Sequence, residues 1–458
     1  MCPPMPRSIV FADLRHTSQT RLLLFALGAF ALASVLSRLV AVVVVLAGAA
    51  LMATSVMSSR AENQERSEDN SRAIVALIAI FAVFSLTGPV HEVFGSVPTW
   101  IFPISGITWL TLGIGWLAFG SPTRARRVIF FLVLVASAAI GTVHVISVSG
   151  VGYDVLFFHE AAADAIAAGV SPYSDAVRVP NGAPDGAPYV VGYPYPPSTA
   201  IAYSVGSWLG DARWTSLAAW LVTLAVIGSR SLRRVGSPVP LGVMVMVAAL
   251  PGWPLVLTAA WSEPFSLALV AIAVVLWSKP RWSGGLVGLF VGSKQYLLAG
   301  APLLATARVR RRWLRAGWAA VGLATSFLPV LVWGVPEFID AAIGFHLDAP
   351  ARPDGTSIVG ALGAFGVAWV PPLWLSGAIV LTIAVVLGNR SSGLHEWLAL
   401  LGVILTVALF LSAQAFPNYW FLIAGIAALA AVSSVSTAAP GARESESSEA
   451  TTTEPASS

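Results

Sequence analysis

The chain has 458 residues, of which 57% are hydrophobic and only 10% charged, and its mean hydropathy is +0.79. Soluble domains do not have this composition, so we expect many membrane-spanning segments. The net charge is +4, and the arginines stand in short runs between apolar segments, a pattern that indicates membrane topology and argues against a nucleic-acid partner. The single cysteine, Cys2, excludes an internal disulfide and a thiolate metal cluster.

The first part of the chain is expected to be a membrane extension. Residues 1–21 are interpreted as a cytoplasmic segment, and residues 22–120 as a helical extension of about four spans. Three arginines precede the first apolar run, which resembles a signal peptide. A second apolar run follows directly after Arg38, which favours a retained pair of helices.

Residues 121–436 are expected to form the membrane core, with a long outer loop at 148–213. Candidate spans lie near 128–147, 214–229, 238–256, 262–278, 316–334, 358–388, 397–413 and 418–435. Residues 198–210 are too few to cross a hydrocarbon core of about 30 Å, so we expect an interfacial or re-entrant helix there. The prediction is an all-α polytopic membrane protein of about 12–14 transmembrane helices, with juxtamembrane helices in its outer loop.

The positive-inside rule predicts the orientation of the chain. If every arginine- and lysine-rich run lies in the cytoplasm, both termini are cytoplasmic. The loop 148–213 then lies on the extracytoplasmic side of the cell membrane. Residues 437–458 are polar and show no periodicity, so they are interpreted as a disordered cytoplasmic tail.

Residues 283–307 differ from the other apolar segments because they contain two short apolar runs around Ser293-Lys294-Gln295, with cations at both borders. A hairpin of two short helices would keep both borders on one side and lift Lys294 toward the opposite face. An ionisable side chain at membrane depth indicates a functional site. The alternative is a lysine that extends outward to the lipid headgroups.

The outer loop begins with a predicted amphipathic helix after Asp154. Its apolar residues recur at three- and four-residue spacing, at Val155, Phe158, Ala162 and Ile166. Asp154 stands at the amino-terminal end, where aspartate is also a preferred helix cap. A capping role and a chemical role for this carboxylate therefore both stay open.

Three segments of the outer loop resemble the pattern of glycosyltransferase family 87: Tyr153-Asp154, Gly169-Val170-Ser171-Pro172-Tyr173 and Tyr193-Pro194-Tyr195-Pro196-Pro197. This family belongs to the GT-C superfamily of membrane enzymes and includes polyprenyl-phosphate-mannose-dependent mannosyltransferases. The resemblance covers about residues 128–435 and implies a GT-C-like bundle whose active site faces the extracytoplasmic side.

The resemblance implies transfer of a mannose-like sugar from a polyprenyl-phosphate donor to a glycolipid or cell-envelope glycan. In such enzymes an acidic residue of the first large outer loop is the general base, a role that falls on Asp154. The leaving phosphate needs cations or hydrogen-bond donors, and we expect them from Lys294, Gln295, His346 and Arg352. No cofactor is assigned, and the involvement of a divalent cation is left open.

Eight further residues are expected to line the substrate cavity: Tyr153, His159, Glu160, Tyr173, Tyr195, Pro196, Asn418 and Tyr419. Simpler explanations exist for several of them. His159 and Glu160 suit a metal or acceptor site but also a solvated helix face, and Tyr419 suits an aromatic anchor at the membrane interface.

Other functional classes have less support in the sequence. The motifs HExxH, GxSxG, Walker A and CxxC are absent, which leaves protease, esterase and ATPase functions unsupported. A transporter or lipid flippase would require intramembrane charges in two corresponding halves, and no such repeat is visible. A non-catalytic partner in envelope assembly would be favoured if Asp154, Lys294 and Tyr195 lay far apart.

Overall fold

The computed structural model describes residues 19–33, 38–57, 67–87, 100–119, 122–148, 154–174, 177–179, 189–232, 237–348, 355–367 and 370–435. Within these residues the regular secondary structure is helical apart from two strands of three residues each. The expected tail at 437–458 and most of the expected cytoplasmic segment at 1–21 lie outside the described residues.

The helices before the outer loop are α2 (Gln19–Ala33), α3 (Arg38–Met57), α4 (Ser67–Thr87), α5 (Ile101–Phe119) and α6 (Thr123–Ser147). The outer loop contains α7 (Asp154–Ala167), β1 (Val177–Val179), β2 (Tyr189–Val191) and α8 (Pro197–Trp208). The chain continues through α9 (Arg213–Ser229), the 3₁₀ turn η2 (Arg230–Leu232), α10 (Val239–Ala248), α11 (Trp253–Thr258), α12 (Glu263–Val275) and α13 (Pro280–Val291). Next come η3 (Gln295–Gly300), α14 (Pro302–Thr306), α15 (Arg312–Phe327), α16 (Val330–Trp333), α17 (Val335–Phe338), the π-helical η4 (Ile339–Gly344) and α18 (Phe345–Asp348). The last helices are α19 (Ile358–Ala364), α20 (Leu373–Gly388), α21 (Leu394–Phe410) and α22 (Pro417–Val435).

The described residues contain five helical segments that are long and apolar enough to cross a membrane: α5, α6, α9 with η2, α15 with α16, and α22. Six shorter apolar helices lie in α2, α3, α10, α12, α20 and α21. The expectation of a helical, multi-pass membrane protein is therefore confirmed.

Two expected spans are each broken into two helices. The span at 238–256 is interrupted between α10 and α11, where Pro251 lacks the N–H that a continuous helix needs. The span at 358–388 is interrupted between α19 and α20, where Gly366 has a φ of +77° that ends the first helix. These breaks shorten the continuous helices that the apolar runs alone had predicted.

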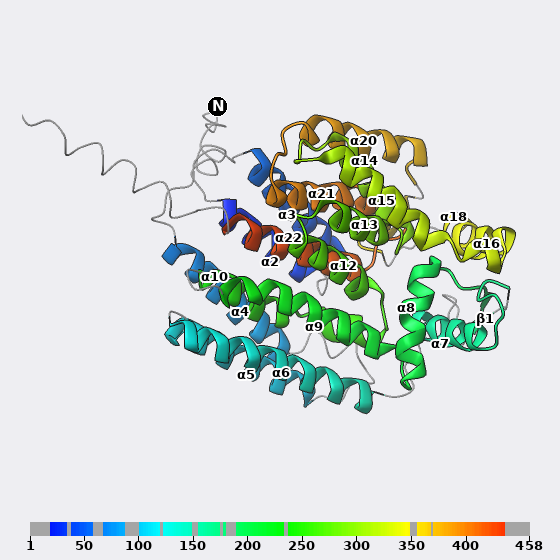
Figure 1. The fold of residues 1–458 in the computed structure, drawn as a ribbon. Coiled ribbons are helices and arrows are strands. Elements are labelled where there is room, and N and C mark those ends of the chain that lie inside the picture. Colours follow the sequence, from blue (N-terminus) through cyan, green and yellow to red (C-terminus); the bar gives the residue numbers. More distant parts are fainter. Residues whose placement is uncertain are drawn as a thin grey trace, which may run out of the picture.

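The main hydrophobic core surrounds α22, which lies within the bundle beside α2, α12 and α21 (Figure 1). Nearly all of α22 is buried. Near its carboxyl end, the hydroxyl groups of Ser434 and Thr20 are hydrogen-bonded at 2.8 Å. The first and last described helices are thus packed together, and α2 belongs to the same bundle as the later helices.

The outer loop lies at one end of the bundle, where α8 runs across the direction of the long helices (Figure 1). This short helix occupies the segment for which we expected an interfacial or re-entrant helix. A second hydrophobic cluster joins α7 to the segment before α8 and to α17, through Phe158, Tyr173, Tyr193 and Phe338. The loop therefore has a small core of its own.

The predicted hairpin around Lys294 is present. Helix α13 leads to a turn at residues 292–294, and η3 and α14 lead back. The two cationic borders meet because Arg315 donates hydrogen bonds to Trp277 O at 2.8 Å and to Ser283 Oγ at 3.1 Å. Lys294 thus lies at the end of the hairpin that is remote from these arginines.

The hairpin depends on close contact between α13 and α15. A Cβ atom at Gly288 would lie 2.0 Å from Ala319 O, so no larger residue fits without a shift of the helices. We expect Gly288→Ala to destabilise the protein by roughly 1–3 kcal/mol through overpacking. Thermal unfolding in detergent measures this effect.

Gly317→Ala is the matched control, because nothing lies within 4 Å of the added Cβ in the same helix pair. Alanine has a higher helix propensity than glycine, so this control should be neutral or slightly stabilising. Equal unfolding temperatures for the two variants would contradict the packing described for Gly288.

Candidate functional site

A buried ion pair lies at the centre of the site. Glu263 is the first residue of α12, and Lys294 lies in the turn between α13 and η3. The Lys294 ammonium pairs with Glu263 Oε1, and the two side chains are 4% and 0% exposed. Lys294 therefore has its counter-charge inside the protein, unlike a lysine that extends outward to lipid headgroups.

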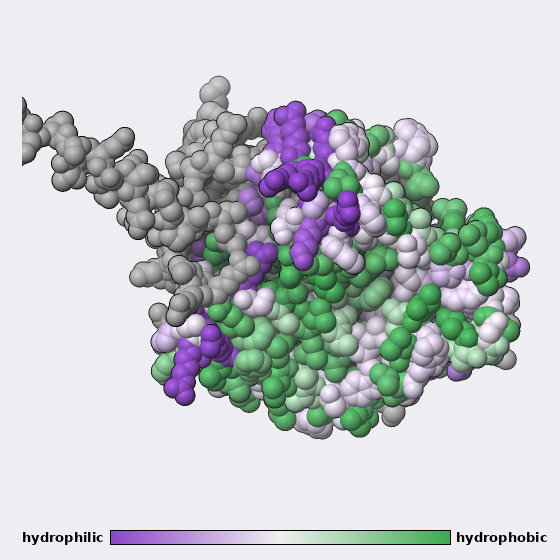
Figure 2. Space-filling view, viewed as in Figure 1, coloured by the Kyte–Doolittle hydropathy of each residue, from purple (hydrophilic) through white to green (hydrophobic). Residues whose placement is uncertain are grey.

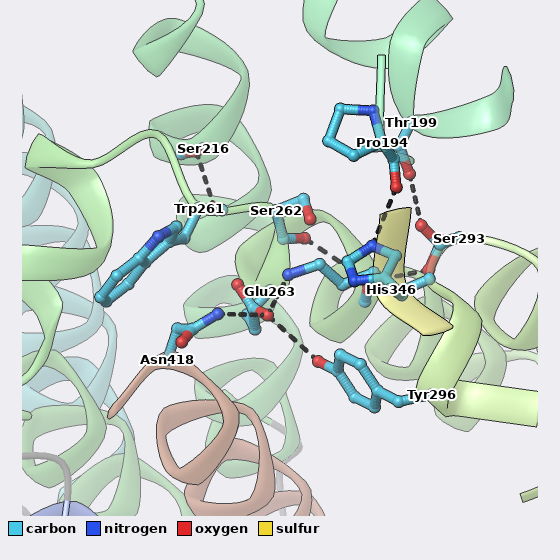
Figure 3. A network of polar contacts seen from close by, with 12 residues as sticks. Pro194, Thr199, Ser216, Trp261, Ser262, Glu263, Ser293, Tyr296, His346 and Asn418 are labelled. Carbon is cyan, nitrogen blue, oxygen red and sulfur yellow. Dashed lines mark hydrogen bonds and ion pairs between the residues drawn. The ribbon is translucent and has the colours of Figure 1, made fainter. Parts of the chain in front are cut away.

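Two neutral side chains complete the contacts of Glu263, and both point toward its carboxylate in Figure 3. Tyr296 OH donates to Glu263 Oε1 at 3.1 Å, and Asn418 Nδ2 donates to the same oxygen at 2.7 Å. One carboxylate oxygen thus accepts three hydrogen bonds, whereas Oε2 has no partner among the described residues. These contacts hold the carboxylate in one orientation.

Three tyrosine rings surround the ammonium group of Lys294. Its Nζ lies 5.2 Å from the ring centroid of Tyr195, 5.6 Å from that of Tyr296 and 5.4 Å from that of Tyr419. The electron-rich faces of such rings attract a cation. Since Tyr195 belongs to the outer loop and Tyr419 to α22, the ammonium lies where the loop meets the bundle.

The amino-terminal end of α8 is fixed to the turn that carries Lys294. Thr199 Oγ1 donates to Ser293 O at 2.5 Å, and Ser198 Oγ donates to Gly292 O at 3.2 Å. Ser293 Oγ is in turn 2.7 Å from Ser266 Oγ of α12. These hydroxyl contacts satisfy backbone carbonyls that the end of α13 leaves without helical partners.

Gln295 and His346 both bind the backbone of the outer loop. Gln295 Nε2 donates to Pro194 O at 2.7 Å and to Ala342 O at 2.8 Å, while His346 Nε2 donates to Pro194 O at 3.1 Å. The amide of Gln295 therefore pairs with backbone carbonyls. Both residues thus contact the residue directly before Tyr195.

Asp154 lies at the first turn of α7 and is partly buried. Burial, together with the nearby negative charge of Asp154, raises the pKa of the Tyr195 hydroxyl well above its ordinary value. Asp154 is thus within electrostatic range of Tyr195, whose ring also faces Lys294. The expected cation lies beside Tyr195, and the charge of the expected base acts on the hydroxyl of the same tyrosine.

Three other residues expected to line the cavity, His159, Tyr173 and Glu160, lie in or shortly after α7. His159 is fully buried, lies 3.9 Å from Tyr203 between ring centroids, and shares a hydrogen bond of 3.0 Å with Tyr193 OH. Tyr173 donates its hydroxyl to a backbone carbonyl at 2.9 Å, and Glu160 is exposed. In the described part of the chain, no group of three or more His, Cys, Asp and Glu side chains is arranged to hold a metal ion.

The structure brings most of the expected site residues together at one end of the bundle. Around the ion pair lie Tyr195, Gln295, His346, Asn418 and Tyr419, with Pro196 at the start of α8. Tyr153 and Arg352 lie outside the described residues.

Sequence reasoning missed Glu263 and Tyr296. A signal for Glu263 was present in the sequence. Glu263 lies within the expected span at 262–278, and a carboxylate in a span indicates a functional site as Lys294 does.

Comparison with known proteins gives one finding. Residues 193–413 match the model of glycosyltransferase family 87. This segment contains Tyr195, Glu263 and Lys294, whereas Asp154 precedes it. No curated protein and no solved structure matches the chain significantly.

The buried imidazole of His159 makes the stability of the outer loop depend on pH. Burial, assisted by the positive charge of Lys294, lowers the pKa of His159 from 6.5 to about 3, so its ring is neutral in the folded chain. The unfolded chain binds this proton below about pH 6.5, so stability is present above that pH and is lost as the pH falls. Between pH 6.5 and 5 the loss is roughly 2 kcal/mol.

We expect His159→Phe to show a smaller loss of unfolding temperature between pH 7.5 and 5 than the wild type. The variant should already be less stable at pH 7.5, because the Tyr193 hydroxyl loses its partner. Thermal unfolding at several pH values measures both effects. An unchanged pH dependence in the variant would show that His159 does not contribute to it.

Proposed function

We propose that this chain, a GT-C membrane glycosyltransferase with a family 87 domain at residues 193–413, uses a polyprenyl-phosphate sugar as its donor. It transfers a mannose-like sugar to a glycolipid or cell-envelope glycan on the extracytoplasmic side. The observation that carries this proposal is the buried Lys294 ammonium beside Tyr195, the residue that also lies near Asp154.

Lys294 has the capacity to bind a phosphate without leaving Glu263. An ammonium group has three N–H donors, and the described residues accept a hydrogen bond from it only at Glu263 Oε1. The other two donors have no acceptor among the described residues, so they remain for phosphate oxygens. Charge placed where negative charge develops on the leaving group stabilises the transition state.

Asp154 is the proposed general base. Its carboxylate removes the proton of the acceptor hydroxyl as that oxygen forms a bond to C1 of the sugar. The bond between C1 and the phosphate oxygen breaks, and its electron pair stays on the phosphate beside Lys294. A single displacement of this kind inverts the configuration at C1.

An apolar groove supports a lipid-linked donor. The groove has a volume of about 380 Å³ and lies between α8, α9 and α12, with Val205, Ala218 and Phe265 among its lining residues. Phe265 and Glu263 both lie in the first turn of α12, so the groove and the ion pair share this helix. Figure 2 shows that the surface over α9 and α12 is largely hydrophobic, which suits a polyprenyl chain.

The distribution of charge supports an extracytoplasmic site. Arg213 at the start of α9 donates a hydrogen bond of 2.9 Å to Val145 O, so the carboxyl end of α6 and the amino end of α9 lie together near α8. The arginines in the first turn of α6, and Arg230 directly after α9, consequently lie at the opposite end. Figure 2 shows the most hydrophilic groups away from α7 and α8, as the positive-inside rule requires of a cytoplasmic end.

The proximity of Lys294, Tyr195 and Asp154 also favours an enzyme over a non-catalytic assembly partner. An assembly partner would not require a buried cation beside a tyrosine on which the charge of Asp154 also acts. The family match favours a transferase over a transporter or flippase.

Asp154→Asn is expected to lower kcat by about 10²–10⁴-fold, because the amide cannot take the proton of the acceptor. The KM for the donor should change little. Purified protein and radiolabelled polyprenyl-phosphate mannose, with membrane glycolipids as acceptors, provide the assay. The control is Asp164→Asn, which removes an exposed carboxylate from the same helix and should retain activity. Wild-type transfer by a folded Asp154→Asn protein would refute the assignment of the base.

Ala218→Trp is expected to block the groove, since Ala218 is exposed within it. The KM for a long-chain polyprenyl-phosphate mannose should rise about tenfold, equivalent to ~1.4 kcal/mol. The KM for a short-chain analogue should be nearly unchanged. Leu381→Trp on the exposed face of α20 is the matched control and should alter neither value. Equal effects of Ala218→Trp on the two donors would contradict the proposed position of the lipid chain.

A further inference from the structure

We propose that Glu263 is a positioning residue for the transfer reaction, which keeps the Lys294 side chain charged and fixed beside Tyr195. This inference rests on the proposed phosphate-binding role of Lys294. Glu263 itself does not contact the donor in this proposal; it acts through the lysine. Glu263 keeps the ammonium of Lys294 charged and holds it in the orientation in which it binds the phosphate.

The burial of the pair makes the counter-charge necessary. Lys294 is 4% exposed and Glu263 is fully buried, so water contributes little to the stability of either charge. An isolated ammonium in such surroundings loses its proton rather than remain charged. A neutral amine would not compensate the negative charge that develops on the phosphate, so the lysine needs Glu263 to perform its proposed role.

The remaining contacts fix where the ammonium lies. Tyr296 and Asn418 donate to the same oxygen that accepts from Lys294, so they hold the carboxylate from two other elements, η3 and α22. The turn at Ser293 is held by Thr199 of α8. The backbone and the head group of Lys294 are therefore both restrained.

Stability alone does not account for the pair. Replacement of both members of a buried ion pair by neutral groups is often neutral or stabilising, whereas loss of one member is strongly destabilising. Glu263 Oε2 and Asn418 Oδ1 are also buried without hydrogen-bond partners among the described residues, which costs free energy. The chemistry of the charged lysine accounts for the pair better than stability does.

The charge on Lys294 is directly observable because the chain contains only two lysines, Lys279 and Lys294. In a Lys279→Arg background, labelling with ¹³Cε-lysine leaves a single lysine side-chain signal in the NMR spectrum. The chemical shift of this signal distinguishes a charged ammonium from a neutral amine. We expect a charged group at pH 7.5, and a neutral one after the further change Glu263→Gln. A charged lysine in both proteins would overturn the inference.

Glu396→Gln is the matched control for this measurement. Glu396 is also a buried carboxylate, but it accepts hydrogen bonds from the backbone N–H groups of Ser392 and Gly393 at the start of α21. Its replacement should lower the unfolding temperature and leave the Lys294 signal unchanged. A shift to a neutral amine in this control as well would assign the effect to general destabilisation and overturn the inference.

Kinetics test the consequence for the reaction. We expect Glu263→Gln to raise the KM for polyprenyl-phosphate mannose at least tenfold, with a smaller change in kcat, and Glu263→Asp to restore most of the loss. A wild-type donor KM in Glu263→Gln would count against the inference. If Lys294→Met has a wild-type donor KM, the phosphate-binding role fails, whereas the lysine signal still decides whether Glu263 maintains the charge.

A double variant covers the case in which Glu263→Gln folds poorly. The protein with Glu263→Gln and Lys294→Met has lost both charges, so it should unfold at a higher temperature than Glu263→Gln alone. This result would confirm the coupling of the two charges. Simple addition of the two single effects would contradict it.

Discussion

Burial of a charge within a membrane protein requires an opposite charge and nearly ideal hydrogen bonding, because removal of an ion from water costs several kcal/mol even after relaxation. Lys294 meets this requirement through Glu263, with Tyr296 and Asn418 as further donors to the carboxylate. These side chains come from α12, η3 and α22. Three elements that are distant in the sequence must therefore lie together at Glu263. This requirement constrains how α12, η3 and α22 pack in the bundle.

The outer loop is fixed to the same point. Thr199 binds the turn before Lys294, and the carbonyl group of Pro194 accepts hydrogen bonds from Gln295 and His346. The rings of Tyr195 and Tyr419 close the space around the ammonium. A displacement of the loop would expose the charged pair, so the position of the loop and the electrostatics of the site depend on each other.

The sequence allowed prediction of the features that local patterns determine. The apolar runs predicted the helical membrane bundle, and the charge in the middle of one run predicted the hairpin at Lys294. Glu263 was missed because a carboxylate at the edge of an apolar run marks the end of a span as readily as a site. The contacts of Gln295 and His346 with Pro194 join residues more than one hundred positions apart, and periodicity contains no information about such pairs.

The position of Asn418 in α22 has a consequence for biosynthesis. A membrane chain is made and inserted from its amino end, so α22 enters the bilayer after α12 and the hairpin that carries Lys294. The partner that Asn418 gives to Glu263, and the contact between Ser434 and Thr20, form only when this helix arrives. Earlier intermediates contain Lys294 and Glu263 without the contact from Asn418, so the charged centre is completed only after α22 has packed against α2 and α12.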